Sequence, residues 1–245
     1  MLKNDYQKAS EIIKNSSFVV AFTGAGISVE SGIPTFRGPE GLWSRYDPKI
    51  LDIDFFLSNP KESWEKIKEI FYDYMGNTAP NDAHKFLAYL EKIGILKAVI
   101  TQNIDSLHQK AGNKNVIEFH GTASKLVCLN CYKKFSSDEI DLDLLPPMCP
   151  ECMGLLKPDF VFFSEPIPKK ALEESLKLSQ ECDCMLVIGT TGEIMPASEL
   201  PRIAKQNGAK IIEINIEKSS YTQTITDIFL NDKATAASNK LKGLL

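Results

Sequence analysis

Short apolar runs alternate along the chain with longer segments in which apolar residues recur at helical spacing. The runs lack the apolar–polar alternation of half-exposed strands, so they are typical of strands buried on both faces of a parallel sheet. They lie at residues 18–22, 96–101, 116–119, 160–163, 185–188 and 211–215. Helical spacing is clearest at residues 2–14, 81–93, 172–178 and 200–207. This order predicts an α/β fold with helices on both faces of a parallel sheet.

Two segments interrupt this order. Residues 124–157 hold four cysteines and few long apolar runs, so we expect a small inserted module there. Residues 39–80 lie between the loop after the first strand and the next helix, and we expect a helical insertion. The large domain would then comprise residues 1–38, 81–123 and 158–245.

Composition and charge narrow the class of protein. The 245 residues are 43% hydrophobic and 24% charged, which is ordinary for a globular domain. A net charge of −4 argues against non-specific nucleic-acid binding, which needs clustered cations to neutralise phosphates. The N-terminus resembles no secretory signal, and no apolar run is long enough to span a bilayer. We therefore expect a cytoplasmic protein without a membrane segment, and a monomer.

Four of the six cysteines are candidate metal ligands. Cys128-x-x-Cys131 and Cys149-x-x-Cys152 form two matched pairs. In a reducing compartment such pairs favour a tetrahedral four-thiolate zinc site, whose closed coordination makes it structural. Two redox pairs are the weaker alternative. The other two cysteines, at positions 182 and 184, are expected to act as small hydrophobic residues near the core.

Glycine or polar motifs follow four of the predicted strands. They are Gly24-Ala25-Gly26, residues 102–105, Gly189-Thr190-Thr191 and Asn215. Ligands of open parallel sheets bind beyond the carboxyl ends of the strands, so these motifs are expected to line one nucleotide-binding crevice. Val29 replaces the third glycine of the dinucleotide fingerprint, and Asp47, the acidic residue at about the spacing of a ribose-binding acid, follows no predicted strand. A hydride-carrier site is therefore disfavoured.

His120 is the candidate general base. It follows a predicted strand and precedes Gly121, which frees the backbone to turn. A neutral imidazole in that place can accept a proton at physiological pH. A hydrogen-bonded core histidine is the alternative. His84, on a predicted amphipathic helix, and His108, near a helix start, are expected to be structural.

Together these residues resemble the sirtuin family. The matching stretches are residues 24–28, 32–38, 101–105, 107–108, 111–112, 119–121, 161–165, 189–191 and 196–197, the four paired cysteines and Asn215. They follow the family's order over most of the chain. The resemblance implies a Rossmann-like large domain, a small zinc-binding domain, and NAD-dependent removal of acyl groups from lysine side chains.

The resemblance also implies which residues would bind NAD. Gly24, Ala25 and Gly26 would hold the pyrophosphate, residues 33–37 would form a mobile lid, and Asn103 and Asp105 would line the nicotinamide pocket. The implied cofactor residues are Gly24, Ala25, Gly26, Ile33, Phe36, Arg37, Gln102, Asn103, Ile104, Asp105, Gly189, Thr190, Thr191, Asn215, Asp232 and Lys233.

The implied reaction consumes NAD as a reagent. The acyl-lysine oxygen would attack the ribose carbon as nicotinamide leaves, and His120 would then take a proton from a ribose hydroxyl. Asn103 is the second implied catalytic residue. The products would be free lysine, nicotinamide and O-acyl-ADP-ribose. The peptide would add as a strand between residues 164–165 and 193–194. The implied substrate residues are Val161, Phe163, Ser164, Glu165 and Ile194.

Several positions depart from the commonest family pattern. Thr35 stands where many members have aspartate, as in the subgroup that removes acidic acyl groups. That subgroup holds the acyl carboxylate with a tyrosine and an arginine, but an alignment without gaps places Ile67 and Ile70 there. We therefore favour acetyl or another uncharged acyl group. Ser164 replaces a usual glycine, and Gly192-Glu193 alters the facing strand.

Three other functions remain as alternatives. Protein mono-ADP-ribosylation would use the same NAD site, and replacing His120 would not have to abolish it. A non-catalytic NAD-sensing zinc module would need no base. A nicotinamide oxidoreductase would form reduced cofactor, whereas a deacylase would release nicotinamide.

Overall fold

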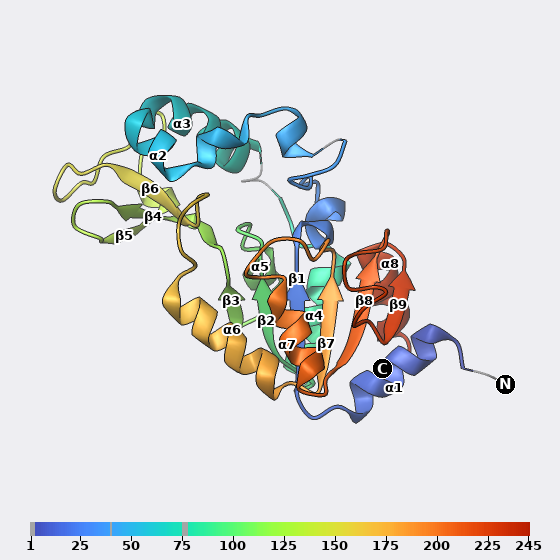
Figure 1. Ribbon diagram of the computed structural model, residues 1–245. Helices are drawn as coiled ribbons and strands as arrows, with labels where there is room; N and C mark the ends of the chain where they lie inside the picture. Colours follow the sequence, from blue (N-terminus) through green and yellow to red (C-terminus); the bar gives the residue numbers. More distant parts are fainter. Residues whose placement is uncertain (1–2, 40, 75–77) are drawn as a thin grey trace.

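The computed structural model describes residues 3–39, 41–74 and 78–245. Its larger sheet has six parallel strands in the order β3-β2-β1-β7-β8-β9 (Figure 1). These strands are β1 (Val19–Thr23), β2 (Leu96–Thr101), β3 (Val116–Glu118), β7 (Cys184–Ile188), β8 (Lys210–Asn215) and β9 (Ile228–Asn231). The predicted parallel sheet is therefore present, but its strand β9 was not among the predicted strands.

Helices cover both faces of this sheet (Figure 1). They are α1 (Asp5–Asn15), α4 (Asp82–Lys92) and α8 (Ala234–Lys242) on one face, and α6 (Lys169–Glu181) and α7 (Glu199–Gln206) on the other. Alternate strand residues divide between the two cores: Val19 and Ala21 pack with the first group, and Val20 and Phe22 with the second. This division explains why the strands read as continuous apolar runs.

Side chains at the helix starts fix several of these boundaries. The Asn4 side chain accepts a hydrogen bond from the Gln7 N–H, and the Gln7 side chain accepts one from the Asn4 N–H in return. Asn81 caps α4 by accepting from the Ala83 N–H at 3.0 Å. Such caps satisfy backbone donors that have no partner within the helix. Helix α1 begins at Asp5, so Lys3 of the predicted 2–14 helix precedes the helix. Positions 1–2 lie outside the described residues.

A second, antiparallel sheet has the order β5-β4-β6. Its strands are β4 (Gly121–Cys128), β5 (Lys134–Ser136) and β6 (Leu156–Phe160). The prediction that residues 160–163 form a strand of the parallel sheet is wrong. Backbone hydrogen bonds between Cys149 and Gly154, and between Leu129 and Leu155, hold the chain beside β4, so β6 pairs there instead.

The insertion lies over this small sheet (Figure 1). It contains α2 (Ile53–Ser58), α3 (Pro60–Ile67) and a π-helix, η4 (Lys68–Tyr74). The buried Trp64 indole joins the insertion to the sheet by donating to the Leu156 carbonyl at 2.8 Å. Of the insertion predicted over 39–80, residues 40 and 75–77 lie outside the described residues.

The small sheet extends from Gly121 to Phe160, beyond both ends of the expected 124–157 module. The division into domains stays a prediction. Short elements complete the described chain: η1 (Ala25–Ser31), η2 (Leu42–Ser44), η3 (Pro48–Leu51), α5 (Leu107–Ala111) and η5 (Ser137–Glu139). None of the helices in the described ranges combines the length and hydrophobicity needed to cross a membrane.

Candidate active site

The carboxyl ends of β1 and β7 lie side by side, and their glycine loops interlock. The Gly24 N–H donates to the Ile188 carbonyl at 3.0 Å, and the Gly26 N–H donates to the Gly189 carbonyl at 2.8 Å. A Cβ on Gly26 would lie 2.6 Å from the Gly189 Cα. Only glycine permits this approach, which leaves bare backbone at the centre of the predicted crevice.

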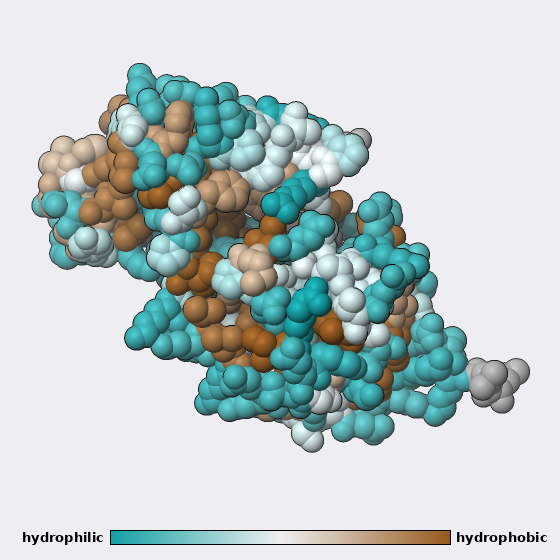
Figure 2. Space-filling view, in the orientation of Figure 1, coloured by the Kyte–Doolittle hydropathy of each residue, from teal (hydrophilic) through white to brown (hydrophobic). Residues whose placement is uncertain are grey.

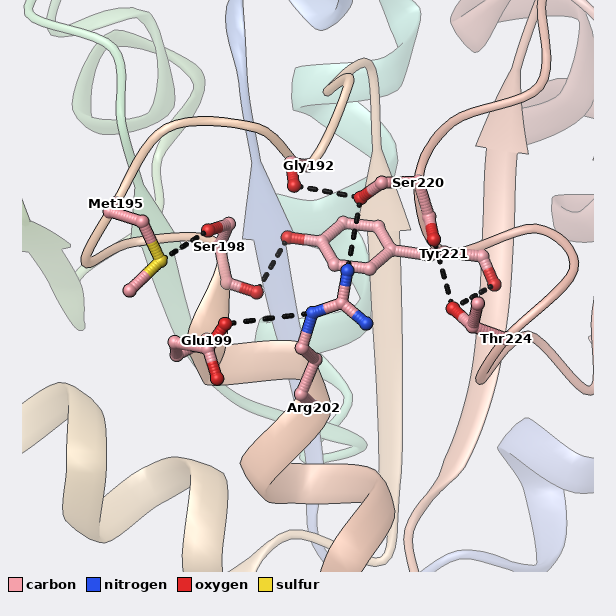
Figure 3. A network of polar contacts seen from close by, with 8 residues as sticks. All are labelled: Gly192, Met195, Ser198, Glu199, Arg202, Ser220, Tyr221 and Thr224. Carbon is pink, nitrogen blue, oxygen red and sulfur yellow. Dashed lines mark hydrogen bonds and ion pairs between the residues drawn. The ribbon is translucent and has the colours of Figure 1, made fainter.

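The loop between β7 and α7 is held by hydrogen bonds from residues that follow β8 (Figure 3). The Ser220 hydroxyl donates to the Gly192 carbonyl at 2.7 Å and accepts from Arg202 at 3.3 Å. The Tyr221 hydroxyl donates to the Ser198 carbonyl at 3.0 Å. These bonds fix the course of the segment that carries the predicted cofactor and peptide residues.

Thr190 connects this loop to two neighbouring strands. Its hydroxyl accepts from the Gln102 amide at 3.1 Å, and its carbonyl accepts from the Asn215 amide at 3.0 Å. Asp232 lies beside Asn215, because its N–H donates to the Asn215 carbonyl at 3.2 Å. The residues predicted after β2, β7, β8 and β9 are therefore brought together.

Asp232 is itself heavily engaged. Its carboxylate accepts from the Tyr6 hydroxyl at 2.9 Å, from Lys240 at 2.7 Å and from the Lys233 N–H at 2.9 Å. These contacts lower the pKa of Asp232, with Lys240 as the largest cause and Tyr6 next. Asp232, one of the two residues predicted at this end of the cofactor site, thus joins α1 and α8 to the end of β9.

A buried polar cluster lies beneath the glycine loop. The Asn103 amide donates to the Gly24 carbonyl and to the Ser28 hydroxyl, both at 3.2 Å, and Ser28 donates to Asp105 at 2.7 Å. Burial raises the pKa of Asp105, while the Leu107 N–H and the Ser28 hydroxyl stabilise its ionised form. The cluster holds one amide and one carboxylate in fixed positions.

Two histidines, which were expected to be structural, extend this cluster into the protein; their contacts with the cluster were not predicted. His84 Nε2 lies 3.4 Å from the Ser28 hydroxyl, and His108 Nε2 lies 2.9 Å from the Thr23 hydroxyl. Their rings are 4.9 Å apart. Burial lowers the pKa of His84 to about 4 and that of His108 to about 3, so both are neutral. The signal available was a histidine on the apolar face of a predicted helix.

His120 lies where the chain leaves the large sheet for the small one. Its Nδ1 is 3.0 Å from the Gln102 carbonyl. A carbonyl can only accept, so Nδ1 carries the proton and Nε2 keeps a free lone pair. Burial lowers the pKa of His120, and the bond to Gln102 partly opposes that shift. The ring is therefore a neutral, oriented proton acceptor.

Aromatic side chains line the way between the two sheets. The ring centroids of Phe36 and Trp43 are 5.6 Å apart, those of Trp43 and Phe163 are 6.1 Å apart, and Phe71 lies 6.4 Å from Phe36. In the space-filling view hydrophobic side chains gather where the two parts of the molecule meet, and the surface is hollowed there (Figure 2). Phe36 comes from the predicted lid and Phe163 from the predicted substrate segment, and Trp43 and Phe71 come from the insertion.

The predicted substrate segment is held from two sides. The Val161 N–H donates to the His120 carbonyl at 2.8 Å, and the Phe163 N–H donates to the Leu51 carbonyl at 2.7 Å. The Phe163 side chain is nevertheless 47% exposed, and the following Ser164 has a φ of +71°. The backbone is thus anchored while the aromatic ring stays available to a ligand.

Two further predicted residues meet across the crevice. The Arg37 guanidinium lies 3.6 Å from the Glu193 carboxylate, and the Thr191 hydroxyl donates to the same carboxylate at 3.4 Å. Ile194 follows with 36% of its surface exposed, whereas Ile33 and Ile104 are buried. An ion pair this exposed contributes little stability, so Arg37 is free to exchange partners.

The four paired cysteines converge in the small part of the molecule. Their Sγ atoms all lie within 4.8 Å of one another; Cys128 and Cys152 are 3.5 Å apart, and Cys131 and Cys149 are 3.8 Å apart. Thiolates at the usual distance from a tetrahedral zinc ion are about 3.8 Å apart. All six cysteines are free of disulfides, and Cys182 and Cys184 are buried as expected. The cluster fits a structural zinc site.

Comparisons with known proteins agree with this architecture. The Sir2 family model matches residues 24–196. An NAD-dependent protein deacylase of Pyrococcus furiosus is 46% identical over 96% of this chain and 95% of its own length. An NAD-dependent protein deacetylase of Thermodesulfovibrio yellowstonii is 46% identical over 93% of this chain and 90% of its own. A solved structure of Sir2 with p53 peptide and NAD+ has a TM-score of 0.89 and 38% identity, covering 96% of each chain. The chain belongs to the Sir2, or sirtuin, family.

Proposed function

We propose that this protein is an NAD-dependent protein-lysine deacylase, with acetyl-lysine as its preferred substrate. The observation that carries the proposal is His120, a neutral imidazole whose Nδ1 proton is engaged by the Gln102 carbonyl. Its Nε2 is a proton acceptor. His120 lies beside the segment predicted to bind substrate, because its backbone carbonyl accepts a hydrogen bond from the Val161 N–H. The similarity to relatives named deacylase and deacetylase supports this assignment.

The residues divide between the two substrates. The glycine loop and the Thr190 network bind NAD, and the Asp105 carboxylate accepts from the nicotinamide carboxamide. In the proposed reaction the acyl oxygen attacks the ribose carbon as nicotinamide leaves. His120 Nε2 then takes a ribose hydroxyl proton, and that oxygen attacks the former acyl carbon. The protonated lysine amine leaves this carbon and water adds to it, which gives free lysine and O-acyl-ADP-ribose. Orientation of both reactants supplies much of the rate, and the base supplies about 10²–10⁴ of it.

The acyl-lysine side chain lies against the aromatic wall in this proposal, and its peptide pairs between Ser164 and Ile194. Ile67 and Ile70, where an acidic-acyl enzyme would need a polar pair, are buried in the core that also contains Phe71. An acyl carboxylate there would lose its hydration without gaining a partner. This favours acetyl over succinyl groups. The monomeric state and the cytoplasmic location stay predictions.

One assay tests the proposal. The zinc-loaded protein is incubated with NAD and matched acetyl-lysine and succinyl-lysine peptides, and mass spectrometry follows nicotinamide, free peptide and O-acyl-ADP-ribose. We expect all three products from the acetyl peptide, and a 10²–10⁴-fold lower rate in His120→Ala with NAD affinity retained.

Other outcomes would replace the proposal. Nicotinamide without peptide deacylation would indicate transfer of ADP-ribose to another acceptor. NAD that is bound but stays intact with every acyl peptide would indicate a non-catalytic sensor. Faster removal of succinyl than acetyl would overturn the assigned acyl preference.

A further inference from the structure

Lys157 is a buried charge in the small sheet. It is 5% exposed and pairs with Val127 across β4 and β6. A buried ammonium loses several kcal/mol of hydration unless charged and polar partners replace the water. The groups that contact the Lys157 ammonium therefore indicate which part of the structure this charge organises.

These partners lie in or directly beside one segment, residues 160–165, which we call the substrate loop. Lys157 Nζ donates to the Phe160 carbonyl at 2.7 Å and to the Pro158 carbonyl at 3.0 Å. It lies 2.9 Å from Glu165 Oε2 and 4.0 Å from the centroid of the Phe162 ring. One ammonium thus contacts the beginning, the middle and the end of the loop.

Glu165 closes the arrangement. The same Oε2 atom accepts from the Phe162 N–H at 2.7 Å. The backbone between Phe160 and Glu165 is thereby folded around the ammonium, while Val161 faces away to bond the His120 carbonyl. Of the predicted substrate residues in this loop, Glu165 pairs with the ammonium, whereas Val161, Phe163 and Ser164 have no hydrogen bond or ion pair with it among the contacts described.

A neighbouring lysine provides a contrast. Lys134 on β5 also pairs with a carboxylate, Asp159 at 2.7 Å, but its side chain is 57% exposed. That pair lies in the same small sheet and has no contact with the substrate loop among the hydrogen bonds and ion pairs described. If a lysine were needed only for solubility or to connect two strands of this sheet, an exposed ion pair such as Lys134–Asp159 would suffice, and Lys157 would not have to be buried.

We propose that Lys157 is a positioning residue that, with Glu165, sets the shape of the substrate loop and so the affinity for the acyl-lysine peptide. This rests on the proposed function for the identity of the peptide. Lys157 does not touch substrate; it acts through the Phe160 carbonyl, the Phe162 ring and Glu165.

The test compares Lys157→Met, Lys157→Arg and Glu165→Gln with Lys134→Met as the matched control. Peptide KM, NAD KM and kcat are measured, together with hydrogen exchange of the Phe162 amide. Hydrogen bonds to charged groups contribute more free energy than bonds between neutral groups, and Lys157→Met removes such bonds from the loop. We therefore expect the peptide KM of Lys157→Met to rise about tenfold. NAD KM stays within about twofold, and the Phe162 amide exchanges faster. Lys157→Arg retains much of the wild-type affinity.

Glu165→Gln keeps an acceptor for the Phe162 N–H but removes the charge, so we expect a smaller rise in peptide KM. This variant carries the test if Lys157→Met does not fold. An unchanged peptide KM in either folded variant, or an equal rise in Lys134→Met, overturns the proposal. Hydrogen exchange separates this result from failure of the proposed function: faster Phe162 exchange in a chain that deacylates no peptide would leave the loop assignment standing and refute only the substrate.

Discussion

The two sheets of this molecule are stabilised in different ways. Every residue of β1 and β7 is buried, and two separate hydrophobic cores cover the large sheet. In the small sheet β4 has buried, half-buried and exposed residues, and β5 has no fully buried residue. The small sheet shares a third hydrophobic core with the insertion, through Leu126, Leu156 and Trp64, and adds the cysteine cluster. The large sheet thus has a core on each face, whereas the small sheet shares its core with the insertion and carries a candidate metal site.

Removing the metal ligands is the largest predicted perturbation of this difference. Cys128→Ser, or a strong chelator, removes a site whose binding energy is also folding energy. We expect amides of 121–160 to lose hydrogen-exchange protection and peptide binding to disappear, while β1 and β7 stay protected. Loss of protection in both sheets together would show that the large sheet is not independent.

A matched pair of core truncations compares the sheets directly. Leu186 in β7 and Leu156 in β6 are both fully buried. Leu186→Ala should lower the global free energy of unfolding by about 2–5 kcal/mol, measured in urea. Leu156→Ala should mainly increase local exchange in the small sheet. Equal effects on global unfolding would mean that the two sheets unfold as one unit.

Acid should weaken the large part through its histidines. The folded-state pKa values of His84 and His108 are about 4 and about 3, below the ordinary 6.5. The unfolded chain therefore binds more protons as pH falls below about 6.5, and stability is lost from there toward pH 4. Each histidine adds at most about 1.4 kcal/mol per pH unit to that slope.

His84→Gln, which does not titrate, isolates this contribution. Its urea-derived stability should fall less steeply than that of the wild type between pH 7 and pH 5. Zinc release at low pH affects both proteins equally, so it cancels in the difference. Parallel slopes would show that His84 is not held neutral by burial.

The smallest predicted effect concerns two serines with positive φ, one beside each sheet. Ser164 has a φ of +71° and Ser106 a φ of +57°. Ser106 shares a 3.1 Å hydrogen bond with Thr122, whereas the contact of Ser164 with Asp52 is long, at 3.5 Å. Ser164→Gly should therefore raise the melting temperature slightly, corresponding to about 0.5–1 kcal/mol, and Ser106→Gly should not. The reverse order would contradict this account.

The difference between the two sheets also explains which elements of the fold could be predicted from the sequence. Strand β2 has the predicted bounds, and the glycine loops occupy the predicted place, because buried parallel strands and close backbone approaches leave local signals. The partner of β6 was mispredicted, since its pairing is decided by cysteine loops distant from it in sequence. Helix α8 was missed because its apolar residues are mostly alanines.

Within the candidate site, the unpredicted residues are those that act through other residues. His84 reaches Asp105 only through Ser28, and Lys157 reaches Phe163 only through the fold of its loop. Nothing in the spacing of such residues reveals these contacts, because they arise when distant segments pack. A charged or imidazole side chain inside an apolar pattern was the available warning.

The position of His120 has a mechanical consequence. It is the second of the two residues between β3 and β4. Gly121 after it has a φ of +76°, and a Cβ there would lie only 2.2 Å from the Asp159 carbonyl oxygen. Points near a pivot move least when two bodies turn about it. If the small part swings to admit a peptide or release a product, the proton acceptor stays nearly stationary while the walls around it travel. In such a motion the base would not have to be realigned in each turnover.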